Sequence, residues 1–435
     1  MYAGIEKSRI GCNLHGALQT VMGIAGVVPI VHSTPGCAIQ QFYAAWAGGI
    51  LSPYWSGFET PASNVYEKQI IFGGASRLRE QMKNTVKVFH GDLYVVLSGC
   101  EAEMVGDDSS SMTAELAEQG VSVICYESAG FKGDVYRGYA GVVDAIFSQL
   151  PAVSSLSGKT EKNLVNILGL IPGQDLCWQG NLQEIQRILG SLGVQVNTLF
   201  GYGQTIADWK RAYQAELTIV LSQWGLKAAE TLRSTYGIPY VEAYGAFLGE
   251  EETALFVHKI AALLSLDTEK IKPYLRGEKE RFIHALRQLT EYYVTYPYQK
   301  EWVMVGDAGT IRRYGTFLNR VLGFSLKRAI VTDAPAGEET PEPSEDLAAL
   351  AEHISFSKDS GEIAALIADS KAGLVLGSGL EQDVARRLGI PHLIVSYPSE
   401  AAVILNRCDV GYTGALTVLE QVSNLIIAHE RCTAR

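Results

Sequence analysis

The sequence is poor in charge and has no basic tract, no CxxC pair and no long apolar run. Only 19% of its 435 residues are charged and 47% are hydrophobic, so the chain can bury large cores. The formal net charge of −11 argues against nucleic-acid binding, because phosphate contacts need clustered lysine and arginine. No run of about 18 apolar residues predicts a membrane span, and the N-terminal MYAGIEKSRIGC lacks the apolar core of a signal peptide. We therefore expect a cytoplasmic protein with neither membrane nor nucleic acid as a partner.

The sequence contains seven cysteines, and a reducing compartment would keep them as thiols or metal ligands rather than as disulfides. Without a CxxC pair, their spacing is not that of a zinc site. The length exceeds that of one ordinary domain and predicts two or three.

Short apolar runs alternate with helical stretches along the whole chain. Their near-continuous apolar character predicts parallel strands covered on both faces, and the Gly, Pro, Ser or Asp that follows each run is typical of βα units. We therefore predict an α/β fold with doubly wound parallel sheets flanked by helices. The runs are Val28–His32, Leu93–Leu97, Val121–Cys125, Leu164–Leu168, Leu217–Leu221, Trp302–Val305, Ala329–Val331, Gly373–Leu376 and Leu393–Val395.

Polar breaks and a faint repeat suggest how the chain divides. Ser154–Lys162 is turn-rich and precedes a new apolar run, and a second break follows the charged helical stretch Thr268–Thr290. Predicted helices end at Gly237 and Gly389, and each is followed by Ile-Pro and a strand, which suggests two similar domains in tandem. The predicted Rossmann-like domains cover residues 1–158, 159–296 and 297–435.

Three cysteines follow a glycine at points where a helix is expected to begin. Cys12 lies in RIGCNLHGA, Cys37 in PIVHSTPGCAIQ and Cys100 in VVLSGCEAEMVGDD. Cys37 and Cys100 also follow predicted strands, so both should lie at the carboxyl-end edge of a sheet, where such folds bind ligands. Helix N-termini favour a thiolate and can donate N–H groups to sulfide.

The preceding glycines, Gly11, Gly36 and Gly99, would let the backbone approach a bulky group closely. Any one of these cysteines alone would be interpreted as a buried thiol that acts as a small hydrophobe. The three together leave two interpretations open, namely iron–sulfur ligation and burial in the core.

These segments resemble the nitrogenase component 1 family over nearly the whole chain. HSTPGC is similar to the family's His-Gly-x-x-Gly-Cys turn, and SGCEAEMVGDD to its third cluster cysteine followed by Ile/Val-Gly-Asp-Asp. EKQIIFGGASRLREQM (Glu67–Met82) resembles the acidic-x-x-x-Phe-Gly-Gly helix, and ESAGFKGD (Glu127–Asp134) resembles the Phe-x-Gly loop. VLSQWGLKAAET and GYTGALTVLEQVSNLI are similar to β-subunit segments, and neither Leu221 nor Ser222 supplies the cysteine by which an α-type subunit holds its metallocofactor.

The resemblance implies that this chain is a β-like subunit of a nitrogenase-like oxidoreductase. Cys12, Cys37 and Cys100 of the first, cluster-binding domain would be its share of an interface iron–sulfur centre, of the 8Fe-7S P-cluster type or 4Fe-4S. An α-like component 1 subunit would complete an α2β2 heterotetramer and hold the catalytic metallocofactor. An ATP-dependent iron protein homodimer would deliver electrons that pass through the interface centre, so no residue of this chain is expected to be catalytic.

Two departures from the resemblance bear on the substrate. The turn is written HSTPGC, and Gly130 aligns with the serine that can ligate the oxidised centre in some nitrogenases, with Ser128 nearby. They favour a nitrogenase-like reductase, such as the methylthio-alkane reductase group that cleaves C–S bonds of small thioethers, over a dinitrogen-reducing β subunit. A cofactor-assembly scaffold subunit and, apart from any resemblance, a metabolite-binding multi-Rossmann protein are the alternatives.

Four further features have two interpretations each. His15, which shares a helix face with Cys12, and His32 fit a contact near the centre and a core hydrogen bond equally well. Cys125 follows a predicted strand and could be a further ligand, but it is interpreted as a core thiol. The carboxylates within Glu101–Asp108 are predicted to be solvated or to cap a helix rather than to orient the loop.

Overall fold

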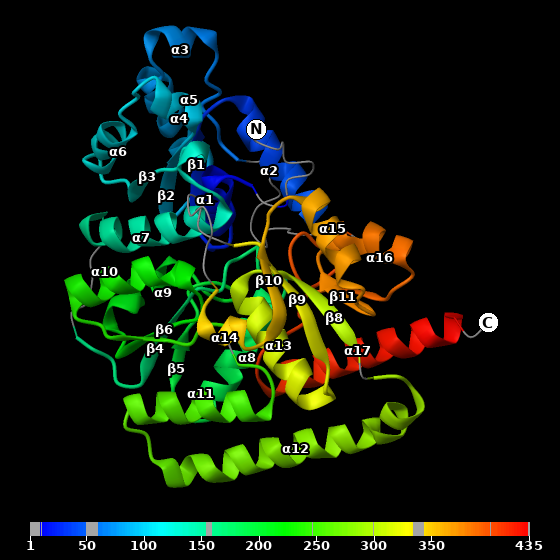
Figure 1. Ribbon diagram of the computed structural model, residues 1–435. Helices are drawn as coiled ribbons and strands as arrows, with labels where there is room; N and C mark the ends of the chain where they lie inside the picture. Colours follow the sequence, from blue (N-terminus) through cyan, green and yellow to red (C-terminus); the bar gives the residue numbers. More distant parts are fainter. Residues whose placement is uncertain are drawn as a thin grey trace. The chain divides into compact units, whose positions relative to one another are not determined.

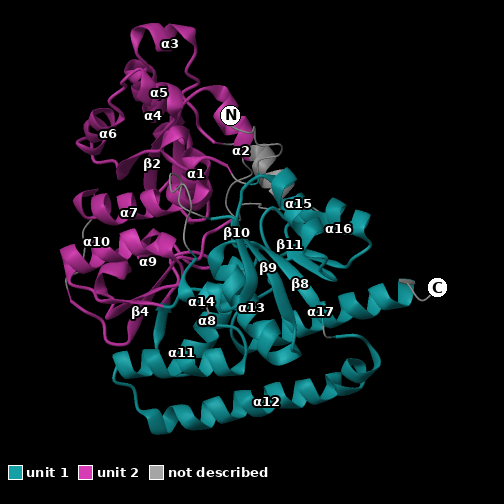
Figure 2. Ribbon diagram, in the orientation of Figure 1, with its two compact units in different colours: residues 1–9, 174–196, 243–435 teal, residues 10–173, 197–242 magenta. Residues whose placement is uncertain are grey.

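The computed structural model describes residues 9, 11–48, 60–153, 159–245, 247–298, 300–333, 343–400 and 402–433, with side chains of 42–48 excluded. Three parallel sheets flanked by helices make up the chain, which confirms the predicted fold class (Figure 1). By compactness the chain forms two units. One comprises residues 10–173 and 197–242, and the other residues 1–9, 174–196 and 243–435 (Figure 2).

The first sheet has the order β1-β2-β3, and its strands end level with one another. His32 at the end of β1 pairs with Ser98 at the end of β2, which in turn pairs with Glu127 at the end of β3. The loops that follow the three strands therefore leave the same edge of the sheet. The strands are β1 (Val27–His32), β2 (Leu93–Ser98) and β3 (Val123–Glu127).

Helices cover this sheet, and two of them touch through glycine. A Cβ on Gly16 of α1 would lie 2.0 Å from the carbonyl oxygen of Val135, and one on Gly138 of α7 would lie 2.2 Å from that of Asn13. Only glycine allows so close an approach. The helices are α1 (Asn13–Met22), α2 (Pro35–Gly48), α3 (Glu67–Phe72), α4 (Ala75–Val88), α5 (Cys100–Met104), α6 (Ser109–Ala117) and α7 (Val135–Val153).

The second sheet has the order β5-β4-β6-β7. Its strands are β4 (Leu164–Leu168), β5 (Gln195–Asn197), β6 (Leu217–Val220) and β7 (Tyr240–Glu242). The helices of this part of the chain are α8 (Trp178–Gly190), α9 (Ile206–Arg211) and α10 (Leu226–Tyr236). Short 3-10 helices are η1 (Gly130–Lys132), η2 (Ala212–Gln214), η3 (Gln223–Gly225) and, in the last part of the chain, η4 (Gly379–Glu381).

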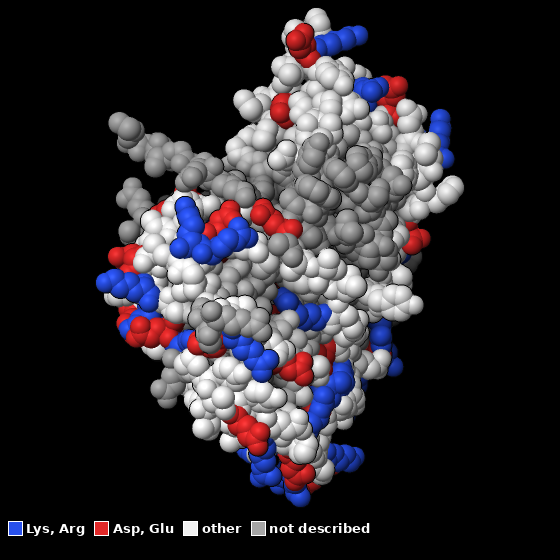
Figure 3. All heavy atoms as spheres, turned by 90° about the vertical axis from the view of Figure 1, so that its right-hand side faces the viewer, with Lys and Arg blue, Asp and Glu red and all other residues white. Residues whose placement is uncertain are grey.

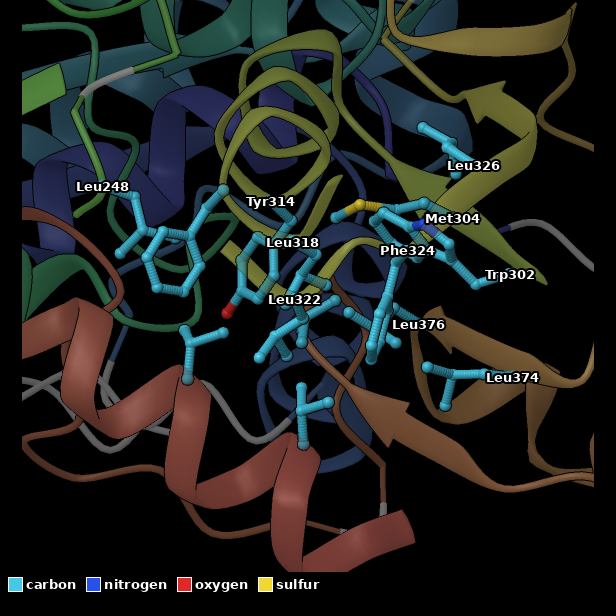
Figure 4. Packing of buried hydrophobic residues seen from close by; sticks show 14 of the residues in the cluster. Leu248, Trp302, Met304, Tyr314, Leu318, Leu322, Phe324, Leu326, Leu374 and Leu376 are labelled. Carbon is cyan, nitrogen blue, oxygen red and sulfur yellow. The ribbon is translucent and has the colours of Figure 1, made fainter. Parts of the chain in front are cut away.

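The third sheet has the order β10-β9-β8-β11-β12. Its hydrophobic core lies between the sheet, α13 and α17, where Tyr314, Leu318 and Leu322 pack among strand side chains such as Met304 and Leu376 (Figure 4). The strands are β8 (Glu301–Gly306), β9 (Ser325–Val331), β10 (Ala351–Phe356), β11 (Leu374–Gly377) and β12 (His392–Ile394). The helices are α11 (Glu250–Leu263), α12 (Thr268–Thr295), α13 (Ala308–Leu322), α14 (Glu345–Ala348), α15 (Ser360–Ser370), α16 (Gln382–Leu388) and α17 (Gly411–Thr433).

The repeated junction is present as predicted. Gly237 and Gly389 each end a helix with φ of 72° and 66°, in the left-handed region that glycine favours, and a strand follows. The three-domain division stays a prediction, since the two compact units group the chain differently and residues 154–158 of the first predicted boundary lie outside the description. Among the described helices, none has the length and apolar character that crossing a membrane requires. Lysine, arginine and acidic side chains are interspersed on the face in Figure 3.

Candidate iron–sulfur site

The structure places Cys12, Cys37 and Cys100 at the N-termini of three helices in one compact unit. Cys12 is the residue before α1, Cys37 is in the first turn of α2 and Cys100 is the first residue of α5. The Pro-Gly before Cys37, expected to form a turn ahead of the helix, is instead the start of α2. Proline suits the first helical position because its ring fixes a helical φ and its missing N–H would have no partner there.

Gly130 brings two of these cysteines together. The loop after β3 carries Gly130 to a place where its amide donates to the sulfur of Cys100, 3.1 Å away. A Cβ on Gly130 would lie 3.1 Å from Cys100 Sγ and 3.2 Å from Cys12 Sγ. The two sulfurs thus flank a single point of the backbone.

His15 contacts both Cys12 and Cys37. Its Nδ1 lies 3.3 Å from Cys12 Sγ, and its Nε2 lies 3.2 Å from the carbonyl oxygen of Cys37. His15 is buried and thus shows features of both interpretations, a contact with a cysteine sulfur and a hydrogen bond to the backbone. His32 instead bonds Ser63 Oγ and Asp107 Oδ2, at 2.8 and 3.0 Å, so it is a core histidine with side-chain partners.

Ser33, which the sequence did not single out, contacts Cys37. Its hydroxyl lies 3.2 Å from Cys37 Sγ and 2.9 Å from Glu101 Oε2. A Cβ on Gly99 would lie 2.1 Å from Ser33 Oγ. Gly99 is therefore required by the close packing of Ser33, whereas the sequence suggested that it makes room for a bulky group.

The thiols differ in how readily they ionise. Burial opposes ionisation of Cys12, but its hydrogen bond to His15 and the charge of His15 outweigh burial and lower the pKa of the Cys12 thiol. Burial raises the pKa of Cys37, partly offset by the bond from Ser33. Burial raises the pKa of Cys125 to about 12, as expected for a core thiol. Since the thiolate is the metal ligand, Cys12 is better prepared for this role than Cys37.

Accessibility separates the candidate cysteines from the others. Cys12, Cys37 and Cys100 are half-buried, whereas three others are buried and Cys432 is exposed. In the part of the chain that the structure describes, no three His, Cys, Asp or Glu side chains gather closely enough to hold a single metal ion. The candidate ligands are the three thiols, and the Gly130 amide donates a hydrogen bond to one of them, Cys100.

The acidic side chains after Cys100 have several roles. Asp108 caps α6 by accepting from the Ser111 amide at 2.9 Å, as predicted. Asp107, whose side chain is 4% exposed, accepts from the Gly74 amide with both oxygens, at 2.7 and 2.9 Å. Glu103 accepts from the amide of Ala129 at 2.8 Å and so orients the loop of Gly130, which the sequence analysis had not favoured.

Fold and site together define an oxidoreductase subunit of the nitrogenase component 1 class. The chain belongs to the family described as "Nitrogenase component 1 type Oxidoreductase", which matches residues 12–427. It is similar to the "Nitrogenase molybdenum-iron protein beta chain" of Methanothermobacter thermautotrophicus, with 21% identity covering 96% of this chain and 93% of that protein.

Two further comparisons agree with this membership. The "Nitrogenase iron-molybdenum cofactor biosynthesis protein NifE" of Methanococcus maripaludis is 24% identical, with 95% of this chain and 84% of that protein covered. The solved structure "Nitrogenase Cp1 at pH 6.5" has a TM-score of 0.81 at 18% identity, covers 98% of this chain and 94% of that one, and shares the fold. The chain is thus a β-chain-like subunit of a nitrogenase-like component 1, in a family whose members hold iron–sulfur clusters.

Proposed function

We propose that this chain relays electrons through an interface iron–sulfur centre, of the 8Fe-7S P-cluster type or 4Fe-4S, held by Cys12, Cys37 and Cys100. The observation that carries the proposal is that the Gly130 backbone lies close to the sulfurs of both Cys12 and Cys100. A Cβ added to Gly130 would be 3.1 Å from Cys100 Sγ and 3.2 Å from Cys12 Sγ. His15 contacts both Cys12 Sγ and the Cys37 carbonyl oxygen, so the segment of Cys37 lies at the same edge.

The donors fit such a centre on condition that a second chain contributes. A cubane needs four ligands, whereas this chain offers three thiols at one edge. The half-buried state of those thiols leaves them accessible to groups from a partner. An α-like component 1 subunit in an α2β2 heterotetramer would complete the ligand set.

This chain's residues would bind and tune the centre. The bound iron–sulfur centre would supply one-electron transfer. The Cys12–His15 contact favours the thiolate at Cys12, and the amide of Gly130 would donate a hydrogen bond to the Cys100 sulfur as a ligand of the centre. The side chain of Ser33 approaches Cys37 Sγ from the buried side of the sheet edge, where it is itself 0% exposed.

An exposed apolar surface on α3 supports docking of an ATP-dependent iron protein. None of the residues of α3 is buried, and Ile71 and Phe72 are 72% and 80% exposed. Met104, at the end of the helix that begins with Cys100, is 77% exposed. Exposed apolar side chains of this size mark surfaces that bind other proteins. Electrons entering here would pass the centre and continue to a metallocofactor on the α-like partner.

The substrate class within this proposal rests on the sequence departures alone. They favour small thioethers, reduced with C–S cleavage, over dinitrogen. The second candidate function is that of a cofactor-assembly scaffold subunit, and the similarity to a cofactor biosynthesis protein at 24% identity favours it. Turnover of thioethers or dinitrogen with an iron protein separates an electron relay from a scaffold.

Iron and acid-labile sulfide per chain test the proposal. The protein is purified anaerobically after co-expression with its α-like partner, as wild type, Cys37→Ala and Cys125→Ala. Wild type and Cys125→Ala should hold the same iron, because Cys125 lies in the sheet core. Cys37→Ala should lose the interface centre while both chains stay folded. Unchanged iron in Cys37→Ala would contradict the assignment.

Docking is tested separately. Phe72→Ala should slow electron delivery from the iron protein at unchanged iron content. Val88→Ala, which removes another apolar side chain that is 71% exposed, is the matched control and should leave delivery unchanged. Equal rates in the two variants would show that α3 is not the docking surface.

A further inference from the structure

One nearly buried carboxylate holds the loop that reaches the cysteines. Glu103 lies in α5, three residues after Cys100, and its side chain is 10% exposed. Its Oε1 accepts from the amide of Ala129 at 2.8 Å and from the hydroxyl of Ser98 at 2.7 Å. Its Oε2 forms an ion pair with Lys132 Nζ at 2.6 Å.

These contacts lie on both sides of Gly130 in the chain. Ala129 precedes it and Lys132 follows two residues later, so a single carboxylate fixes both ends of η1. Ala129 is 0% exposed, and without Glu103 its amide would be buried with no acceptor, which costs about 1–3 kcal/mol. The loop would therefore move, and the Gly130 amide would leave its place 3.1 Å from Cys100 Sγ.

We propose that Glu103 is a positioning residue that fixes the Gly130 amide on the Cys100 sulfur and thereby sets the reduction potential of the centre. The inference rests on the proposed function, in which Cys100 is a ligand. Hydrogen bonds to ligand sulfurs are one of the means by which a protein tunes such potentials. An N–H donor stabilises the more negative, reduced form, so the bond from Gly130 raises the potential.

The charge of Glu103 has the opposite effect. A carboxylate near the centre disfavours the added electron and lowers the potential, and the ion pair with Lys132 offsets part of this effect. Loss of the N–H···S bond thus lowers the potential, whereas loss of the charge raises it. The two roles of Glu103 can be told apart by the sign of the change.

Two variants separate charge from position. Glu103→Gln loses the charge and the ion pair with Lys132, but it keeps an oxygen where Oε1 accepts from Ala129 and Ser98. Lys132 would keep its other partner, Glu127 Oε2, at 2.9 Å. Glu103→Asp keeps the charge but is shorter by one methylene, about 1.5 Å, and cannot reach both the loop and Lys132. If Glu103 acts by position, Glu103→Asp lowers the potential and Glu103→Gln does not.

The experiment is an anaerobic redox titration of the complex with its α-like partner, followed by electron paramagnetic resonance. Pulsed measurements after exchange into deuterated water report the exchangeable proton near the centre. We expect Glu103→Asp to show a lower midpoint and a weaker deuterium coupling. Glu103→Gln should keep the wild-type coupling, with a midpoint equal to or above that of wild type.

Equal midpoints in Glu103→Asp and wild type would overturn the inference, and so would a fall in potential in Glu103→Gln. If Glu103→Asp assembles no centre, iron loading of Glu103→Gln decides. Loading at the wild-type level supports a positioning role, because Glu103→Gln keeps the acceptor for Ala129 and Ser98, and loss of iron in both variants overturns it. A wild-type complex without iron would instead refute the proposed function itself, so the two failures are distinguishable.

Discussion

Substitution of Gly130 by alanine should destabilise the protein and reduce iron loading, because the added methyl has no room. Its Cβ would lie 3.1 Å from Cys100 Sγ and 3.2 Å from both Cβ and Sγ of Cys12. Overpacking of this kind costs about 1–3 kcal/mol. Gly130 has no positive φ, so alanine would gain roughly 0.4–1 kcal/mol through lower entropy of the unfolded chain. The two ranges together give a net loss of unfolding free energy between about 0 and 2.6 kcal/mol, with a centre at about 1.3 kcal/mol.

Gly277→Ala makes the same chemical change where there is space. Gly277 lies within α12, and a Cβ there would meet nothing within 4 Å. Alanine in a helix interior is favoured over glycine by roughly 0.5–1 kcal/mol, so this variant should be more stable than wild type. The two substitutions are therefore expected to change stability in opposite directions.

Urea unfolding of the iron-free proteins under reducing conditions measures both changes, and iron per chain after loading measures the consequence for the site. If Gly130→Ala were as stable as wild type and took up full iron, the sulfurs of Cys12 and Cys100 would be free to separate. The close packing around Gly130 would then not be a determinant of the site.

Two further predictions concern the unit that carries the third sheet. Asp409→Ala should cost about 3–5 kcal/mol of unfolding free energy, because it leaves the Arg313 guanidinium buried without its carboxylate, at side-chain exposures of 5% and 3%. Arg320 lies on the same helix as Arg313, α13, and forms exposed pairs with Glu251 and Glu252 of α11. Arg320→Ala should therefore cost at most about 1 kcal/mol in the same urea titration. Burial lowers the pKa of His392 below its ordinary value of 6.5, so the unfolded chain binds the proton first as pH falls. Stability should therefore decrease below pH 6.5 with a slope of up to about 1.4 kcal/mol per pH unit from this residue, and His392→Gln should remove that part of the slope.

The sequence predicts the buried strands well and the edge strands poorly. The first sheet and most of the third carry continuous apolar runs, because both faces of a parallel strand are covered. The strands β5 and β10 lie at the ends of their sheets and have exposed or half-exposed residues. No apolar run in the sequence therefore predicts them. The sequence also predicts that helices begin at Cys12, Cys37 and Cys100, because each belongs to a Gly-Cys pair at the end of a strand or loop.

The contacts around the cysteines could be predicted only in part. The proximity of His15 to Cys12 follows from helical spacing. Glu103 and Ala129 are 26 residues apart and meet because neighbouring strands end level, which no local pattern in the sequence encodes. Ser33 was missed for the same reason, because its partner Glu101 belongs to α5, the helix after the next strand.

The level ends of β1, β2 and β3 also bear on the order of events in biogenesis. Cys37, Cys100 and Gly130 follow three separate strands and become neighbours only when the parallel pairs His32–Ser98 and Ser98–Glu127 have formed. Such pairing joins distant parts of the chain and is slow. Metal cannot template this fold in the way that it templates a zinc finger, whose ligands are close in sequence. If the chain holds the proposed centre, the polypeptide would reach its folded form before the centre is inserted, and its thiols would have to stay reduced until then.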